Sequence, residues 1–213
     1  MSISTEVTTF RALQAEECGT GQYQQTVVER ALADLPEGEL LIEVHFSSLN
    51  YKDALSAFGN KGVTRAYPHT PGIDAAGIVV EDSSGTFKAG DSVIVIGYDL
   101  GMNTAGGLGQ YIRVPANWAC ALPEGLSLRE AMAYGTAGFT AALCIEKIQA
   151  IGACPEDGDV AVTGASGGVG CFSVALLSSL GFNVAAITGK LEEREFLVSL
   201  GARQVIDRET LMD

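Results

Sequence analysis

A glycine-rich segment in the C-terminal half has the residue types that bind phosphate. Residues 162–170 read Val-Thr-Gly-Ala-Ser-Gly-Gly-Val-Gly, between an apolar run and a segment with helical periodicity. Glycines let the backbone approach a pyrophosphate, and a helix N-terminus offers free N–H groups and a partial positive charge. If Gly167 and Gly170 are the second and third glycines of a dinucleotide fingerprint, Ala165 replaces the first. The context favours a dinucleotide site, with a plain tight turn as the alternative.

The end of the next expected strand indicates which dinucleotide would bind. An NAD site usually carries Asp or Glu at this tip, where the carboxylate bonds the ribose 2′-OH. Here the strand at 183–188 ends in Thr188-Gly189-Lys190, and Arg208 follows a third strand at the same edge. Cations bind a 2′-phosphate well, and a hydroxyl can donate to it. The sequence therefore predicts NADPH, and the alternative is that Lys190 is an ordinary solvated lysine.

Two N-terminal segments concentrate polar and aromatic side chains. Residues 48–53 read Ser-Leu-Asn-Tyr-Lys-Asp, and residues 68–77 combine two prolines, two glycines and a carboxylate. Rigid turns of this kind often hold functional groups in place, although a purely structural role is the alternative. His45 faces away from the core in the alternating strand 40–46, and His69 lies in a turn. We interpret both histidines as structural or solvated rather than catalytic.

The elements that must position these residues change in character near residue 125. Before it, short strands separated by turns are expected at 40–46, 77–81, 92–96 and 110–114. In the first of these strands, Ile42, Val44 and Phe46 share the expected core face. This half is predicted to be a mainly β unit.

After residue 125, helices and strands alternate. Ser127 and Glu130 form a capping box for a helix that runs through Met132, and a second helix is expected from Phe139 to Ile148. The following strands are predicted at 159–164, 183–188 and 204–207, with helices at 168–180 and 191–200 between them. Sequential β-α-β units imply a parallel sheet.

Composition excludes several classes of protein. The chain has 213 residues and a net charge of −13, from 26 acidic and 13 basic residues, which argues against nucleic-acid or anionic-membrane partners. Its five cysteines include no CxxC pair, so neither a disulfide framework nor a cysteine-rich zinc site is expected. The sequence shows no secretory signal and no apolar run of membrane-spanning length, so we expect a cytoplasmic protein.

Four motifs together resemble the medium-chain dehydrogenase/reductase superfamily. They are, in chain order, residues 50–53 (Asn-Tyr-Lys-Asp), 71–74 (Pro-Gly-Ile-Asp), 135–141 (Gly-Thr-Ala-Gly-Phe-Thr-Ala) and 163–170, which contains the glycine loop. Within the superfamily the chain is similar to the zinc-independent, quinone-oxidoreductase-like branch, and there to the acrylyl-CoA reductases. This resemblance implies an α/β fold, with a GroES-like catalytic domain at 1–125 and a Rossmann domain at 126–213 that stops after its third strand.

The resemblance also implies an activity. The expected enzyme uses NADPH to reduce the activated C=C of an enoyl thioester, acrylyl-CoA to propanoyl-CoA, with a quinone as the alternative substrate. A full-length parent is expected to be a homodimer acting on a small molecule. Because the chain stops early, a truncated, non-catalytic nucleotide-binding protein is the alternative from another class.

The site residues follow from the same resemblance. Asn50 would orient the reactants, Tyr51 would contact cofactor or substrate and could supply the proton, and Asp74 would support Asn50. Zinc-dependent relatives have a Cys where this chain has Asn50 and a His where it has Ile73, so no metal is expected. The expected cofactor-binding residues are Tyr51, Thr136, Ala165, Ser166, Gly167, Gly168, Val169, Gly170, Thr188, Gly189, Lys190 and Arg208.

Overall fold

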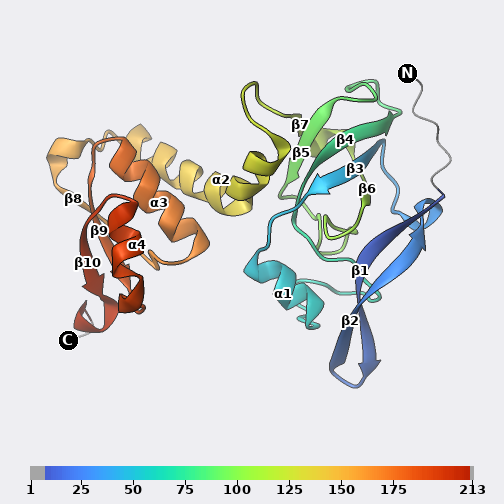
Figure 1. Cartoon of the computed structure of the whole chain (residues 1–213), viewed down its shortest axis with the longest axis horizontal. Helices are drawn as coiled ribbons and strands as arrows, with labels where there is room; N and C mark the ends of the chain where they lie inside the picture. The colour runs from blue at the N-terminus through green and yellow to red at the C-terminus, as the bar shows by residue number, and fades with distance from the viewer. Residues whose placement is uncertain (1–7, 212–213) are drawn as a thin grey trace. The chain divides into compact units, whose positions relative to one another are not determined.

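The chain folds into two compact units, shown in Figure 1. The computed structural model describes residues 8–211. The first unit ends at Thr136 and the second begins at Ala137, so the division falls within helix α2 (Leu128–Ala150). The domain boundary expected from the sequence, after residue 125, lies shortly before this helix.

A five-stranded antiparallel sheet forms the body of the first unit. Its strand order is β6-β3-β4-β5-β7. The strands are β3 (Leu40–Phe46), β4 (Asp74–Asp82), β5 (Ser92–Ile96), β6 (Tyr111–Val114) and β7 (Ala119–Ala121). Buried aliphatic side chains such as Leu40, Val79 and Ile112 form its core. Strands β3, β5 and β6 agree closely with the sequence prediction, but β4 begins three residues early, so that Asp74 belongs to the strand and pairs with Ile96.

The alternation predicted for β3 holds for only part of the strand. Ile42 is buried and Val44 is half-buried, but Phe46 is 41% exposed. The expectation that Phe46 packs in the core was therefore wrong. The register of β3 with β4 shifts between Val44 and Phe46, although Phe46 still pairs with Ala76.

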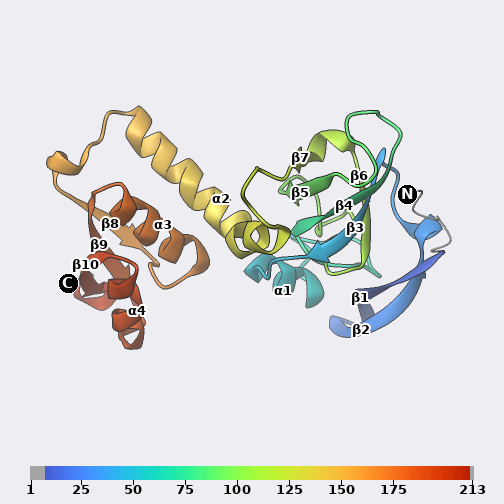
Figure 2. The same cartoon turned by 45° about the horizontal axis from the view of Figure 1, so that its top comes forward.

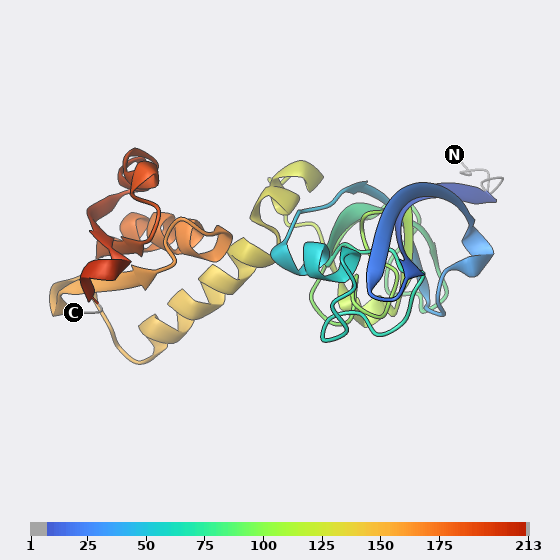
Figure 3. The same cartoon turned by 90° about the horizontal axis from the view of Figure 1, so that it is seen from below.

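A long hairpin precedes this sheet and was not predicted. It consists of β1 (Thr9–Gly19) and β2 (Gln22–Ala31), the curved blue ribbons of Figure 3. Strand β2 contacts the helix α1 (Tyr51–Ala57), because Gln25 Nε2 donates to the Ala57 carbonyl at 2.7 Å. The hairpin thereby supports the end of α1 opposite to Asn50.

Helix α2 starts with the capping box that the sequence predicted. Ser127 N–H donates to the Glu130 carboxylate at 2.9 Å, and Glu130 N–H donates to Ser127 Oγ at 3.2 Å. The two expected helices are nearly continuous. Only Gly135, with φ 50° and ψ −158°, interrupts the helical backbone. The predicted gap between residues 132 and 139 is thus a single-residue kink.

The second unit contains a three-stranded parallel sheet in the order β10-β9-β8. Its strands are β8 (Asp159–Thr163), β9 (Asn183–Thr188) and β10 (Ala202–Asp207), with helices α3 (Gly168–Ser179) and α4 (Arg194–Ser199) between them, as Figure 2 shows. The predicted β-α-β-α-β order is confirmed. The helix expected at 191–200 is shorter, because its first turn is a 3₁₀ helix.

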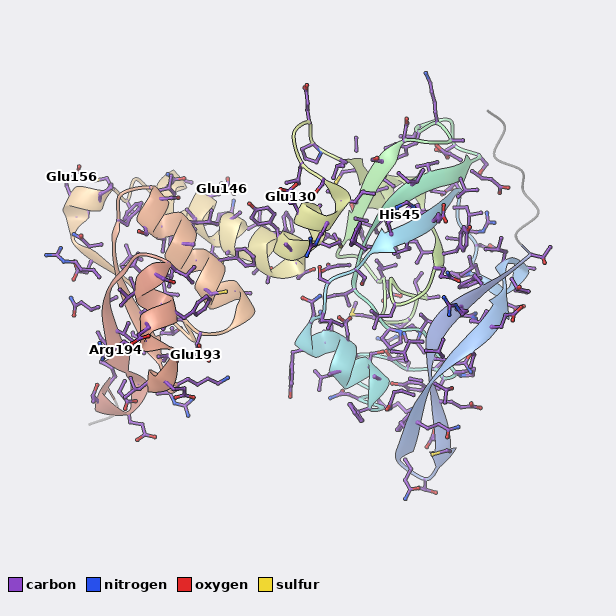
Figure 4. All side chains as sticks on the ribbon, in the orientation of Figure 1. His45, Glu130, Glu146, Glu156, Glu193 and Arg194 are labelled. Atoms are coloured by element: carbon purple, nitrogen blue, oxygen red, sulfur yellow. The ribbon has the colours of Figure 1, made fainter. Side chains whose placement is uncertain are left out.

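Buried aliphatic side chains from both helices cover this sheet. Val174 and Leu177 of α3 and Leu197 of α4 pack on Val184 of β9. Arg194, labelled in Figure 4, joins α4 to β10, since its guanidinium donates to the Val205 carbonyl at 3.0 Å.

Short 3₁₀ helices and one aromatic stack complete the fold. The 3₁₀ helices are Leu32–Asp34, Ala116–Trp118, Pro155–Asp157, Leu191–Glu193 and Arg208–Leu211. Tyr98 stacks face to face on Trp118, with ring centroids 5.1 Å apart. Among residues 8–211, no helix combines the length and the apolar character needed to cross a bilayer.

Candidate functional site

Asn50 lies at the junction between β3 and α1, where the chain turns from strand to helix. It has an extended backbone and serves as the N-cap residue of α1. Its side-chain amide is held in place by Asp74, because Nδ2 donates to Asp74 Oδ2 at 2.9 Å. The structure therefore brings together two of the three residues predicted to be catalytic, Asn50 and Asp74.

Asp74 is fully buried and receives several donors. Besides Asn50, the Thr136 N–H donates to Oδ2 at 2.9 Å, and the Thr136 hydroxyl donates to Oδ1 at 2.5 Å. Ser47 Oγ donates to the Asp74 main-chain carbonyl at 2.8 Å. A buried carboxylate is stable only when hydrogen bonds replace its hydration, and this one is well supplied. Asp74 thus ties Asn50 to the start of the second segment of α2.

Gly135 permits this arrangement. Its φ of 50° is left-handed, and a Cβ there would lie 2.3 Å from Ser48 Oγ and 2.7 Å from Asp74 Oδ2. Any other residue would therefore displace the carboxylate or the helix. The kink in α2 is what allows Thr136 to donate both of its polar hydrogens to Asp74.

Asp53 is a second buried carboxylate, and the sequence analysis did not select it. Its Oδ2 accepts the Asn50 N–H at 2.8 Å and its Oδ1 accepts the Ile73 N–H at 2.9 Å. It therefore joins the segments 50–53 and 71–74 through their main chains. Burial raises the pKa of Asp53, and the negative charge of Asp74 adds to this increase. The Asn-x-x-Asp spacing of a capping box was the signal that could have identified it.

Tyr51, the third residue predicted to be catalytic, points away from this network. Its side chain is 81% exposed at the first turn of α1. It lines a cavity of about 510 Å³ together with Leu55, Phe58 and Asn60. The phenol is therefore accessible to a ligand.

The glycine loop of the second unit has the geometry of a phosphate cradle. Gly164 has φ 61°, and Gly167 N–H donates to the Gly164 carbonyl at 2.9 Å, which turns the chain into α3. A Cβ at Gly170 would lie 2.2 Å from the Gly164 carbonyl oxygen, so only glycine fits. This is the close helix–strand approach that the third fingerprint glycine provides. Ala165, in place of the first glycine, is fully buried.

A cavity of about 680 Å³ lies beside this loop. Six of the residues predicted to bind the cofactor line it: Ser166, Gly167, Thr188, Gly189, Lys190 and Arg208. Thr163, Gly164, Ile187 and Leu211 complete the lining. Ala165, Gly168, Val169 and Gly170 belong to the loop and the first turn of α3 but are not among these lining residues. Tyr51 and Thr136 belong to the first unit.

The cations of the cavity gather at the ends of β9 and β10. A Cβ at Gly189 would lie 2.7 Å from Arg208 Nε, so the guanidinium covers this glycine beside Lys190. Thr188 is buried, and its hydroxyl accepts the Lys190 N–H at 3.0 Å and bonds Ser166 Oγ at 2.8 Å. Ser166 is thus held in the lining by Thr188. No carboxylate lines this cavity within residues 8–211.

The residues at the zinc positions of related enzymes have no zinc-binding chemistry. Asn50 offers an amide that is bonded to Asp74, and Ile73 offers a buried alkyl side chain. Throughout the described part of the chain, no three His, Cys, Asp or Glu side chains cluster as metal ligands.

The two histidines differ in their environments, since one is buried and the other is exposed. His69 is buried with Nε2 3.0 Å from the Gly101 carbonyl, and burial lowers its pKa. His45 is exposed, with Nε2 3.8 Å from Glu43 Oε2.

Comparisons with known proteins identify relatives of this fold. The family model of the alcohol dehydrogenase GroES-like domain matches residues 36–124. YhfP of Bacillus subtilis, provisionally named a quinone oxidoreductase, is 46% identical over 206 residues, which are 97% of this chain and 62% of that protein. Its structure with NAD bound has a TM-score of 0.92.

Two further relatives are similar to the same extent. The acrylyl-CoA reductase AcuI of Ruegeria pomeroyi is 45% identical over 192 residues, covering 90% of this chain and 58% of AcuI. The yhdH oxidoreductase of Salmonella enterica in complex with NADP has 45% identity and a TM-score of 0.91, over 94% of this chain and 61% of that one. The chain therefore spans about three-fifths of the length of these relatives.

A GroES-like unit followed by a parallel β-α-β-α-β unit with a glycine loop defines a class of oxidoreductase. The chain is similar in sequence and in fold to members of the medium-chain dehydrogenase/reductase superfamily. Within it, its relatives are those of the quinone-oxidoreductase-like branch.

Proposed function

We propose that the protein is an NADPH-dependent oxidoreductase that reduces the activated C=C of an enoyl thioester, acrylyl-CoA to propanoyl-CoA. The observation that carries this proposal is the meeting of Lys190 and Arg208 in the cavity beside the glycine loop. Similarity to an acrylyl-CoA reductase and to an NADP complex supports the same assignment. The domain roles would be catalysis for residues 1–125 and NADP binding for residues 126–213.

The second unit has the features that an NADPH molecule requires. The loop from Gly164 to Gly170 offers a cradle without side chains to the pyrophosphate, at the N-terminus of α3. Lys190, Arg208 and Ser166 offer two cations and a hydroxyl to the 2′-phosphate. When bound, NADPH supplies a hydride for the β-carbon of the substrate.

The residues of the first unit would orient the substrate and manage the proton. Asn50 is fixed by Asp74, which Thr136 holds in turn, so its amide is positioned before a substrate arrives. Tyr51 is exposed and carries a hydroxyl that can donate to the α-carbon or to the carbonyl oxygen, where negative charge develops. Asp74 acts as a positioning residue, because all its described partners are donors within the protein.

The choice of cofactor can be tested by titration. Lys190→Ala should weaken NADPH binding by about 1–2 kcal/mol and leave NADH nearly unchanged, because it removes one charge-assisted contact to the 2′-phosphate. The measurement is a fluorescence titration with both cofactors, and Lys147→Ala, at an exposed position outside the cavity, is the control. Equal losses for NADPH and NADH would contradict the assignment, a necessary check because a close relative was crystallised with NAD.

A quinone is the second candidate substrate. The cavity beside Tyr51 is also lined by Phe58, and two aromatic side chains beside an open space suit a flat ring. Parallel assays of NADPH oxidation with acrylyl-CoA and with a quinone distinguish the two acceptors. Tight NADPH binding with turnover of neither would favour a non-catalytic nucleotide-binding protein.

We further propose a homodimer located in the cytoplasm and acting on a small molecule. The similarity to oxidoreductases that act on small molecules supports the last point. Sedimentation equilibrium measures the oligomeric state, and a monomer at micromolar concentration would contradict the first.

A further inference from the structure

A groove of about 580 Å³ lies in the first unit, and it shares no lining residue with the cavity beside Tyr51 or with the cavity beside the glycine loop. We call it the hairpin groove, because Arg11, Leu13 and Val27 of the β1–β2 hairpin form one side of it. Phe46 and Leu49, at the end of β3 and just after it, contribute to its other side.

The hairpin groove exposes large apolar side chains. Leu49 is 85% exposed, Val27 is 69% exposed and Phe46 is 41% exposed. Phe46, which lies outside the core of the sheet, lines this groove. Large exposed apolar patches that are rimmed by polar residues mark interaction sites or ligand-binding grooves.

The charge in the groove has the opposite sign to that of the whole chain. Arg11 and His45 line it, and no carboxylate does among residues 8–211, although the net charge of the chain is −13. His45, labelled on β3 in Figure 4, has Glu43 at 3.8 Å. Arg11 is exposed and faces Glu29 in the hairpin register, yet it forms no ion pair within 4 Å among the described residues.

The groove also reaches the residues that hold Asn50. Ser47 lines it and donates from Oγ to the Asp74 carbonyl at 2.8 Å. Gly107 lines it too, and a Cβ there would lie 2.2 Å from the same carbonyl oxygen. From Gly107 to Gln110, beside Arg11, an extended chain covers about 10 Å, at roughly 3.3 Å per residue. A ligand along the groove would therefore have one end near Asn50 and the other near Arg11.

We propose that the hairpin groove binds the coenzyme A portion of the substrate, with its phosphates at Arg11 and its pantetheine arm over Leu13, Val27 and Phe46. This inference rests on the proposed function, and it assigns the enoyl thioester rather than the quinone as the substrate that the chain is built to hold. A pantetheine arm is an extended chain in which apolar methylene and methyl groups alternate with two amides and a hydroxyl, and the phosphates of coenzyme A are anions. Those are the two properties that the groove complements. A quinone carries no phosphate for Arg11.

The test is calorimetric titration of the whole chain with coenzyme A alone. To exclude binding of its adenosine phosphates in the nucleotide cavity, every variant carries Lys190→Ala and Arg208→Ala. On this background Arg11→Ala should weaken coenzyme A binding about fivefold, and the difference should shrink at high salt. Glu29→Gln should strengthen binding, because it removes a competing anion beside Arg11. Lys88→Ala, in an exposed turn outside the groove, should change nothing.

Apolar contact is tested separately. Val27→Ser should weaken binding of both coenzyme A and pantetheine, whereas Arg11→Ala should weaken only coenzyme A. Circular dichroism confirms that each variant folds. Where turnover is measurable, Arg11→Ala should raise the KM for acrylyl-CoA and leave that for a quinone unchanged.

Two results would overturn the inference. One is an unchanged dissociation constant for coenzyme A in Arg11→Ala. The other is a change of oligomeric state in Val27→Ser without loss of coenzyme A binding, which would make the groove a contact between copies. Failure of the chain to bind NADPH, with coenzyme A binding intact, would instead count against the proposed cofactor and leave the groove assignment standing.

Discussion

At the scale of single residues, the site depends on two buried carboxylates with different partners. Asp74 accepts side-chain and main-chain donors from Asn50 and Thr136, whereas Asp53 accepts main-chain N–H groups from both motif segments. Neither faces a described cation within 4 Å, so hydrogen bonds rather than ion pairs compensate their burial. Each donor removed should therefore leave a carboxylate oxygen incompletely paired.

Thr136 provides the direct test of this compensation. Thr136→Val removes the hydroxyl that donates to Asp74 Oδ1 and should lower the free energy of unfolding by about 1–3 kcal/mol, the cost of an unpaired buried acceptor. Urea unfolding measures it. Thr136→Ser keeps the hydroxyl and should recover most of the loss. If Val and Ser cost the same, the hydroxyl contributes nothing to the site.

His69 should make the stability of the first unit depend on pH. Burial lowers its pKa below the ordinary value of 6.5, so the unfolded chain binds the proton more readily than the folded one. Stability is therefore present above about pH 6.5 and is lost as the pH falls below it. Thermal unfolding between pH 5 and 8 should show this slope, and His69→Gln should flatten it. The exposed His45, changed to Gln, should leave it intact, and an equal effect of both would refute the assignment.

At the scale of elements, the kink in α2 decides the geometry of the site. Gly135→Ala would place a Cβ against Ser48 and the Asp74 carboxylate in a left-handed backbone, and it should cost more than about 3 kcal/mol. Gly125→Ala is the matched control. Gly125 also has a positive φ, of 83°, but a Cβ there meets nothing within 4 Å, so it should cost about 1–2 kcal/mol. Chemical denaturation of both variants gives the comparison, and similar losses would remove the steric argument.

The elements differ in how far the sequence predicted them. The strands and helices from residue 159 onward carry strong local signals, such as apolar runs, a glycine loop and glycine stops at Gly181 and Gly201. The hairpin β1–β2 lacked them, since most of its side chains are exposed and its pairing is set by the partner strand. Phe46 lies outside the core because the register with β4 shifts beside it. A shift of register depends on both strands, so the sequence of one strand alone does not reveal it.

The sequence predicted the residues of the candidate site better than the contacts between them. Residue types and the resemblance selected Asn50, Asp74 and the cations at 190 and 208. The contacts of Asp74 with Asn50 and with Thr136 span 24 and 62 positions along the chain, and the second depends on the kink at Gly135, so no local pattern could supply them. Asp53 was missed although its capping-box spacing is local, because a capping role was not considered together with the neighbouring segment 71–74.

At the scale of the whole molecule, each buried core belongs to one unit. Leu177, Leu197 and Val184 lie in the core of the second unit, whereas Leu40 and Ile112 lie in that of the first. Leu177→Ala should cost about 2–5 kcal/mol, and that loss should fall on the second unit. Hydrogen exchange read by peptide should accelerate in β8, β9 and β10 and remain unchanged in β3 and β4. Uniform acceleration would mean that the chain unfolds as a single cooperative whole.

The fluorescence of Trp118, which stacks on Tyr98, gives a second test of whether the two units unfold separately. Trp118 is the only tryptophan in the chain, and it lies in the first unit. Its emission spectrum therefore follows the environment of that unit alone, whereas far-ultraviolet circular dichroism follows the secondary structure of both units. Denaturation curves recorded by both signals therefore show, without any label, whether the first unit unfolds together with the rest of the chain or separately from it.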